Sequence, residues 1–138
     1  MPEDKINILI VDDEEQFLDF ISKRLETRGF NVRTAGNGEE AIEVSRNETI
    51  DIVILDLKMP VMDGEAALEA LKKEHPEMEI IILTGYGTVD TAVSCIRNGA
   101  YYYLQKPCDI EKLLEVISEA YEKFIMSRKN IKSVKEKL

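Results

Sequence analysis

The chain has 138 residues, 44% of them hydrophobic, which is enough for one domain with a buried core. This composition excludes a disordered protein, and no stretch approaches the roughly 20 apolar residues of a membrane span. The N-terminus lacks the pattern of a secretory signal, and a net charge of −9 argues against nonspecific DNA binding by the whole chain. We therefore expect a cytoplasmic globular domain in which Cys95 and Cys108 are reduced thiols.

Short apolar runs alternate along the chain with segments of helical periodicity. The first helical segment, for example, repeats apolar residues at Phe17, Ile21 and Leu25, and Gly29 follows as its C-cap. In chain order we predict strand 6–11, helix 13–28, strand 31–35, helix 38–46, strand 52–55, helix 65–74, strand 80–83, helix 88–98, strand 101–104 and a last helix from Ile110.

This alternation predicts an α/β protein with a parallel sheet and helices on both of its faces. Right-handed crossovers limit the topologies, and the common five-stranded doubly wound solution has the strand order 2-1-3-4-5. Its switch point lies between the first and third strands, and ligands of open α/β sheets bind at such points.

Polar residues follow the predicted strands where phosphoryl chemistry would need them. Asp12 and Asp13 follow the first strand, Asp56 the third, Thr84 the fourth and Lys106 the fifth. Because the carboxyl ends of parallel strands share one edge, we expect three carboxylates, a hydroxyl and an ammonium to meet there.

Carboxylates held close together repel one another, and a divalent cation relieves that repulsion. Mg²⁺ takes oxygen ligands from one or two carboxylates, so we expect Asp13 and Asp56 to be direct ligands, with Asp12 reaching the ion through water. A carboxylate can also attack phosphorus to form an aspartyl phosphate. In phosphoryl transfer, Lys106 would then supply positive charge and the Gly85 backbone N–H a hydrogen bond.

At this point the residues resemble a known family. The pair Asp12-Asp13, the string 56–64 (DLKMPVMDG), Thr84-Gly85 and the string 103–107 (YLQKP) resemble the receiver domain of two-component response regulators over about residues 5–124. The resemblance implies a flavodoxin-like fold, with the receiver domain at 1–124. It also implies a phosphorylation-dependent signalling switch, not a conventional enzyme, that controls an output such as transcription.

The resemblance also implies roles for the acidic residues. Asp56 is similar to the family's phosphoacceptor, which receives its phosphoryl group from a phosphohistidine on a sensor histidine kinase. Asp12 and Asp13 are similar to the acidic pair that holds Mg²⁺ together with Asp56, and the backbone carbonyl of Lys58 would be a further ligand.

Further roles are implied on the other side of the site. Thr84, Gly85 and Lys106 would contact the phosphoryl group, and the Lys106–Pro107 bond is expected to be cis, which X–Pro bonds allow. Thr84 and Tyr103 would form the switch pair. In that scheme the Thr84 hydroxyl moves toward the phosphoryl group, the Tyr103 ring turns inward, and the surface of the fourth helix, fifth strand and fifth helix changes.

Two alternatives stay open beside the switch. The first is a stand-alone phosphorelay shuttle. The second is a Mg²⁺-dependent phosphohydrolase, which often has a second acid two residues after its nucleophile, where this chain has Lys58. We also expect Lys58 and Tyr86 to flank the path of the hydrolytic water and so to slow loss of the phosphoryl group from Asp56.

The C-terminal residues differ in composition from the rest of the chain. Residues 125–138 carry five basic side chains against one acidic side chain, and the chain before them has a net charge near −13. We read this segment as a basic helical extension that either pairs with a second copy or is a frayed tail. A coiled coil is favoured by heptad positions at Ile110, Leu113, Ile117, Ala120, Phe124, Ile131, Val134 and Leu138.

The string 82–92 (ILTGYGTVDTA) resembles receivers of NtrC-like sigma-54-dependent activators. The chain contains neither an ATPase nor a helix-turn-helix pattern. We therefore expect the output domain to lie outside it.

Overall fold

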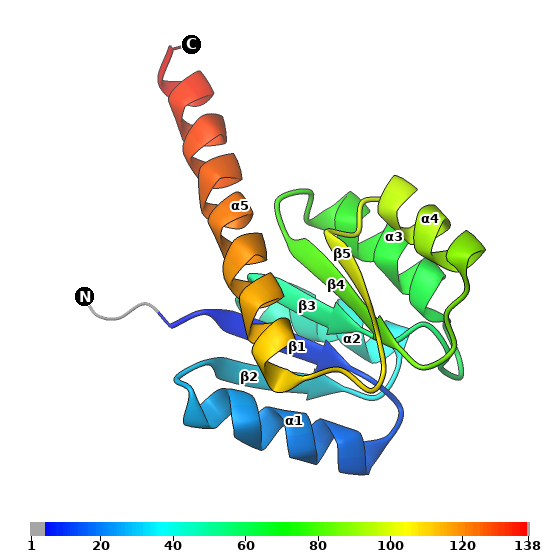
Figure 1. Ribbon diagram of the computed structural model, residues 1–138. Helices are drawn as coiled ribbons and strands as arrows, with labels where there is room; N and C mark the ends of the chain where they lie inside the picture. The colour runs from blue at the N-terminus through cyan, green and yellow to red at the C-terminus, as the bar shows by residue number, and fades with distance from the viewer. Residues whose placement is uncertain (1–4, 138) are drawn as a thin grey trace.

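Figure 1 shows the computed structural model, which describes residues 5–137 and the side chains of residues 5–129. Five strands and five helices alternate within this range. They are β1 (Asn7–Val11), α1 (Glu15–Thr27), β2 (Asn31–Ala35), α2 (Gly38–Asn47), β3 (Ile52–Leu55), α3 (Gly64–Glu74), β4 (Glu79–Thr84), α4 (Val89–Arg97), β5 (Tyr102–Gln105) and α5 (Ile110–Lys137).

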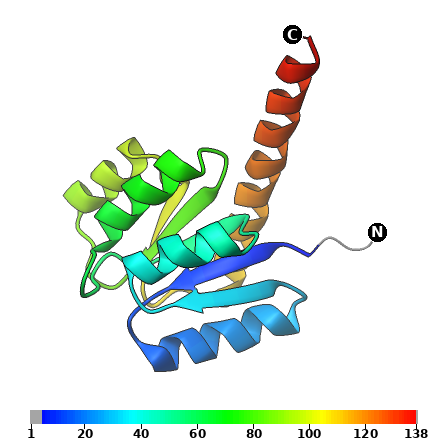
Figure 2. The same ribbon diagram turned by 180° about the vertical axis from the view of Figure 1, so that it is seen from behind.

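The strands form one parallel sheet in the order β2-β1-β3-β4-β5, which confirms the predicted fold. Val11 of β1 lies beside Leu55 of β3, so these two strands end level with each other. Figures 1 and 2 show the sheet between two layers of helices. The switch point of the sheet therefore lies where β1 and β3 end.

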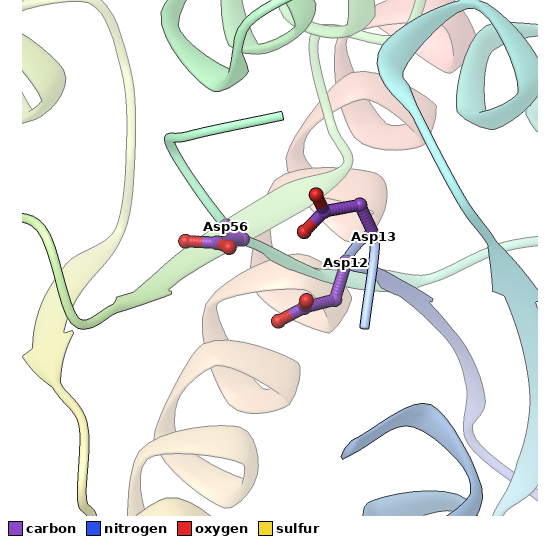
Figure 3. Close-up of side chains that lie close together, drawn as sticks. All are labelled: Asp12, Asp13 and Asp56. Atoms are coloured by element: carbon purple, nitrogen blue, oxygen red, sulfur yellow. The ribbon is translucent and has the colours of Figure 1, made fainter. Parts of the chain in front are cut away.

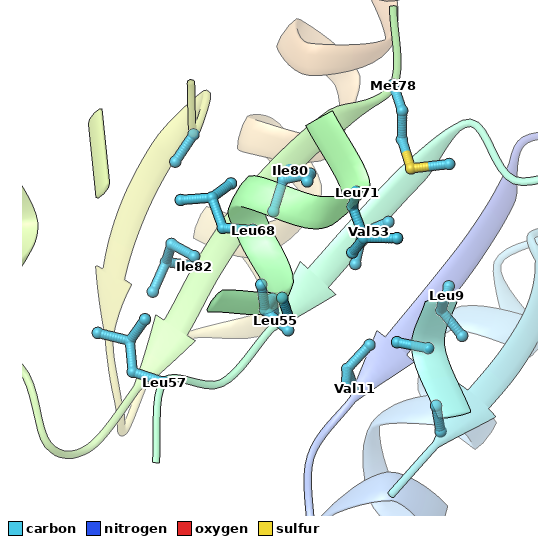
Figure 4. Packing of buried hydrophobic residues seen from close by; sticks show 14 of the residues in the cluster. Leu9, Val11, Val53, Leu55, Leu57, Leu68, Leu71, Met78, Ile80 and Ile82 are labelled. Carbon is cyan, nitrogen blue, oxygen red and sulfur yellow. The ribbon is translucent and has the colours of Figure 1, made fainter. Parts of the chain in front are cut away.

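The two faces of the sheet bury alternate residues of the same strands. In β1, Leu9 and Val11 pack toward α2, α3 and α4, whereas Ile8 and Ile10 pack toward α1 and α5. Figure 4 shows the first of these clusters, in which Leu68 of α3 packs against the sheet. Each fully buried aliphatic side chain contributes roughly 1.5–3 kcal/mol, so the strand ends are held on a rigid base.

Some observed boundaries differ from the predicted ones for local reasons. Helix α1 begins at Glu15 rather than Asp13, because the Glu14 backbone N–H donates to Asp12 Oδ1 (2.9 Å) before the helix starts. Strand β4 also includes the polar residues Glu79 and Thr84 at its ends. An apolar run cannot reveal them, but Glu79 pairs with Ile52 of β3 and Thr84 with Gln105 of β5. As predicted, Gly29 follows α1, with a φ of 92° that favours glycine.

Helix α5 is 28 residues long and extends well beyond the sheet (Figure 1). Its inner face buries Leu113, Ile117, Ala120 and Phe124 against the sheet, in agreement with the first part of the heptad pattern. The heptad positions Ile131, Val134 and Leu138 lie outside the described side chains. No helix in the described part of the chain is long and apolar enough to cross a membrane.

Candidate functional site

Three aspartates lie together at the carboxyl ends of β1 and β3 (Figure 3). Each offers a carboxylate oxygen, and these oxygens lie within 4.8 Å of one another. Asp12 and Asp56 are 1% and 2% exposed, whereas Asp13 is open to solvent. The sequence prediction that Asp12, Asp13 and Asp56 converge at one sheet edge agrees with this geometry.

Backbone groups fix the two buried carboxylates. The Asp56 N–H donates to the Val11 carbonyl (3.0 Å) and so continues the hydrogen bonding of β1 and β3 past the last paired residue. Asp56 Oδ1 accepts from the Leu57 N–H at 2.8 Å, and Asp12 Oδ1 accepts from the Glu14 N–H at 2.9 Å. One oxygen of each carboxylate is thereby oriented, which leaves Oδ2 for other partners.

The Lys106 ammonium lies among these acids from the end of β5. Its Nζ donates to Asp12 Oδ2 at 2.5 Å, and it lies 3.6 Å from Glu14 Oε1 and 3.9 Å from Asp56 Oδ2. The Phe17 ring of α1 covers the ammonium at 4.1 Å from the ring centroid, a cation–π geometry. Burial alone would lower the pKa of Lys106, but the bond and charge of Asp12, with Asp56 and Glu14, raise it.

Asp56 is held in an environment that disfavours its charge. Burial raises its pKa above the ordinary value, and the charge of Asp12 raises it further. Hydrogen bonds from Thr84 and Leu57 and the charge of Lys106 act in the opposite direction without cancelling the shift. Two buried carboxylates and one exposed carboxylate therefore share one ammonium, and this oxygen-rich, under-neutralised donor set fits a divalent cation.

Replacing Asp56 by Asn is expected to stabilise the metal-free protein by about 1 kcal/mol at pH 7. A raised folded-state pKa means that the contribution of neutral Asp56 is present below about pH 4 and lost as the pH rises through the raised value. The advantage of Asn should therefore grow with pH. Urea unfolding at pH 4 and pH 7 measures it, and a variant less stable than wild type at pH 7 would contradict the charge imbalance.

The fourth strand brings a hydroxyl and a loop to the same edge. Thr84 is fully buried, and its hydroxyl accepts from the Tyr86 N–H (3.2 Å) and acts to lower the pKa of Asp56. The Lys58 ammonium lies 4.6 Å from the centroid of the Tyr86 ring, which is 63% exposed. Lys58 and Tyr86 therefore contact each other, which their sequence spacing did not predict.

The loop between β5 and α5 completes the arrangement. The Lys106 N–H donates to the Thr84 carbonyl at 2.9 Å, and the Lys106–Pro107 bond is cis, the isomer that the resemblance implies. Gly85 lies against this loop, since a Cβ added to it would be 3.9 Å from Lys106 Cβ. Tyr103 lies near the start of β5, three residues before Lys106, and is half-buried with its hydroxyl directed toward α4.

Sequence reasoning missed two residues of the site. Gly64 has no role of its own in the sequence prediction beyond the string 56–64, but its N–H donates to the Leu57 carbonyl (2.8 Å) and an added Cβ would overlap the Asp56 carbonyl oxygen. Phe17 was assigned only to the buried face of α1, although it also covers Lys106. The signal for Phe17 is its place in the first turn of the helix that follows Asp12 and Asp13, close to the strand ends.

The chain is similar in sequence to known response regulators and transcriptional regulatory proteins. An NtrX-like response regulator of Rickettsia bellii is 41% identical over 128 residues, 91% of this chain. The transcriptional regulatory protein ZraR of Escherichia coli is 37% identical over 120 residues, 87% of the chain. The chain spans 27% of the length of each of these curated relatives.

Solved structures with the same fold lead to the same class. A CheY-like receiver domain protein of Methanospirillum hungatei superimposes with a TM-score of 0.86 at 33% identity, covering 90% of this chain and 99% of that one. NtrX of Brucella abortus also gives 0.86 at 33% identity, covering 94% of this chain and 29% of its own. The family model for the response regulator receiver domain matches residues 8–118. The chain therefore belongs to the response regulator receiver domain family of two-component systems.

Proposed function

We propose that this chain is a phosphorylation-controlled switch in which Asp56 accepts a phosphoryl group from a phosphohistidine of a sensor histidine kinase. The observation that carries the proposal is a buried Asp56 beside two further aspartates and the Lys106 ammonium. An Asp56 oxygen attacks phosphorus, the P–N bond to the donor imidazole breaks, and its electron pair leaves with the imidazole. Lys106, Thr84 and the Gly85 N–H bind the oxygens of the transferred group.

We propose that the site holds Mg²⁺ through Asp12, Asp13, Asp56 and the backbone carbonyl of Lys58. When bound, the ion neutralises the negative charge of the incoming phosphoryl group and of the carboxylates. Both Asp12 oxygens already accept hydrogen bonds, from Glu14 and Lys106, which supports Asp13 and Asp56 as direct ligands and Asp12 as a ligand through water.

We infer that the phosphorylated form acts through the surface of α4, β5 and α5. Exposed apolar side chains gather there, at Val89, Val93 and Ile96 of α4 and at Tyr102 of β5. Thr84 and Tyr103 form the switch pair that links this surface to Asp56. Since relatives that match most of this chain are transcriptional regulators, the regulated output is transcription in the cytoplasm.

We propose that 1–124 is the receiver domain and that 125–138 links it to an output domain or pairs with a second copy. The exposed α4–β5–α5 surface is a second place for such pairing. Multi-angle light scattering with and without a phosphoryl mimic tests the pairing, and a monomer at high concentration in both states would contradict pairing and leave the linker role.

Tyr86→Ala is expected to speed loss of the phosphoryl group several-fold. Hydrolysis needs water to attack phosphorus in line with the Asp56 oxygen. We propose that Lys58 and Tyr86, which contact each other two residues after Asp56 and Thr84, cover this approach. A cation–π contact at an exposed site stabilises by about 0.5–1 kcal/mol, a factor of roughly two to five. The decay of labelled protein measures it, with Tyr102→Ala, an exposed tyrosine on β5, as the control. Equal decay of both variants and wild type would exclude a shielding role.

Labelling with acetyl phosphate tests the proposal itself. With Mg²⁺ present the intact mass should rise by one phosphoryl group, and with a chelator it should not. Mass gain that is independent of Mg²⁺ would contradict the metal-assisted mechanism.

A further inference from the structure

The Tyr103 side chain is held at its hydroxyl end by two residues outside the acidic cluster. Its ring leaves β5, packs against the buried cluster on the α2–α3–α4 face of the sheet, and places its hydroxyl 3.2 Å from Thr91 Oγ1. On another side the hydroxyl lies against the Gly87 backbone in the loop between β4 and α4.

Gly87 makes room for this position of the ring. A Cβ added to Gly87 would overlap the Tyr103 hydroxyl and lie 2.5 Å from its Cζ and 3.0 Å from its Cε1. The φ of Gly87 is not in the left-handed region, so the backbone itself does not call for glycine. The space occupied by the tyrosine is therefore what excludes a side chain at this position.

Thr91 connects the same hydroxyl to the start of α4. Thr88 is the N-cap of this helix, and the two threonines form a reciprocal capping box. Thr91 Oγ1 accepts from the Thr88 N–H (2.8 Å) and donates to the Thr88 carbonyl (2.9 Å). Because this donation uses the only proton of the Thr91 hydroxyl, the Tyr103 O–H is the donor in their shared bond.

We propose that Gly87 and Thr91 are positioning residues that hold the Tyr103 hydroxyl and so couple the ring of Tyr103 to the first turn of α4. We call this position of the ring, with its hydroxyl against Gly87 and Thr91, the seat. The inference rests on the proposed function, since it concerns how phosphorylation of Asp56 changes the first turn of α4. In this structure the Tyr103 hydroxyl occupies this position, 3.2 Å from Thr91 Oγ1 and against Gly87. A phosphoryl group that draws Thr84 toward Asp56 would keep the ring in the seat.

The consequence falls on the surface that a partner would contact. Val89 is the first residue of α4 and Val93 lies one turn later, and both are exposed. When the ring leaves the seat, the capping residue Thr91 loses a hydrogen bond and the first turn of α4 becomes easier to open. The seat thereby ties the order of this apolar surface to the position of Tyr103.

A double-mutant cycle in the unphosphorylated protein tests the coupling. Thr91→Val removes the acceptor and Tyr103→Phe removes only the donor. Hydrogen exchange of the α4 amides should show that Thr91→Val speeds exchange about fivefold more in the Tyr103 background than in the Phe background, the net effect of one hydrogen bond. Thr88→Val, which damages the same cap without contacting Tyr103, should have the same effect in both backgrounds. Additive effects of Thr91→Val and Tyr103→Phe would overturn the proposal.

Gly87→Ala tests whether the Tyr103 ring needs the space that Gly87 leaves. In spectra of tyrosine-labelled protein, the Tyr103 signal should shift in this variant and stay in place in Gly36→Ala, where an added Cβ meets nothing within 4 Å. An unmoved Tyr103 signal in Gly87→Ala would also overturn the proposal. Mass gain with acetyl phosphate is recorded for every variant. Failure to label wild type refutes the proposed function, whereas labelling without coupling refutes only the seat.

Discussion

Gly64→Ala is expected to lower the free energy of unfolding by about 3 kcal/mol and to impair phosphorylation of Asp56. A Cβ at Gly64 would overlap the Asp56 carbonyl oxygen and lie 2.5 Å from Leu57 Cα. Both neighbours are backbone atoms at the end of β3, so neither can move away without displacing the phosphoacceptor. Urea unfolding measures the stability, and the initial rate of labelling by acetyl phosphate measures the geometry of the site.

Gly36→Ala is the matched control for this substitution. Gly36 lies at the same edge of the sheet after β2, its φ is not in the left-handed region, and an added Cβ meets nothing within 4 Å. We expect a change of no more than about 0.5 kcal/mol and normal labelling. If the two variants were equally stable, Gly64 would not be in close contact with the phosphoacceptor backbone.

Lys106→Met is expected to destabilise the metal-free protein by about 3 kcal/mol at pH 7, because it leaves the buried Asp12 and Asp56 without their cation. The Lys106 side chain is only 18% exposed, so solvent screens its ion pairs weakly. Methionine keeps the apolar contact with Phe17 while removing the charge. Adding Mg²⁺ should narrow the deficit, since an ion held by the same carboxylates replaces part of the lost positive charge. Thermal unfolding with and without Mg²⁺ measures both effects.

Arg33→Met is the control for a lost cation. Arg33 forms an ion pair with Glu48 at 2.9 Å, but both side chains are largely exposed. Its removal should cost at most about 1 kcal/mol, and Mg²⁺ should not reverse that cost. A Lys106→Met protein as stable as Arg33→Met would contradict the view that Lys106 offsets buried charge.

The sequence was sufficient for the fold and for the residues at the strand ends. Apolar runs locate strands, the βα alternation restricts the topology, and a parallel sheet then forces Asp12, Asp56 and Thr84 to one edge. None of these steps requires knowledge of side-chain packing. The predicted fold and site therefore stay the same when a helix or strand boundary is wrong by one or two residues, as at the start of α1.

The contacts that the sequence did not reveal all depend on packing between elements. Lys58 meets Tyr86 across two loops, Phe17 covers Lys106 from a different layer, and Thr91 binds Tyr103 from the next helix. Periodicity assigns a residue to a face but does not say which polar atom that face brings near it. Such contacts follow only from the three-dimensional arrangement.

Asp56 as the phosphoacceptor is the central claim, and intact-mass analysis after incubation with acetyl phosphate and Mg²⁺ tests it most directly. Wild type should gain one phosphoryl group and Asp56→Asn none. Asp63→Asn should label like wild type, because asparagine keeps the α3 cap in which Asp63 Oδ1 accepts from the Ala66 N–H. No gain on wild type, or an equal gain on Asp56→Asn, would contradict the account.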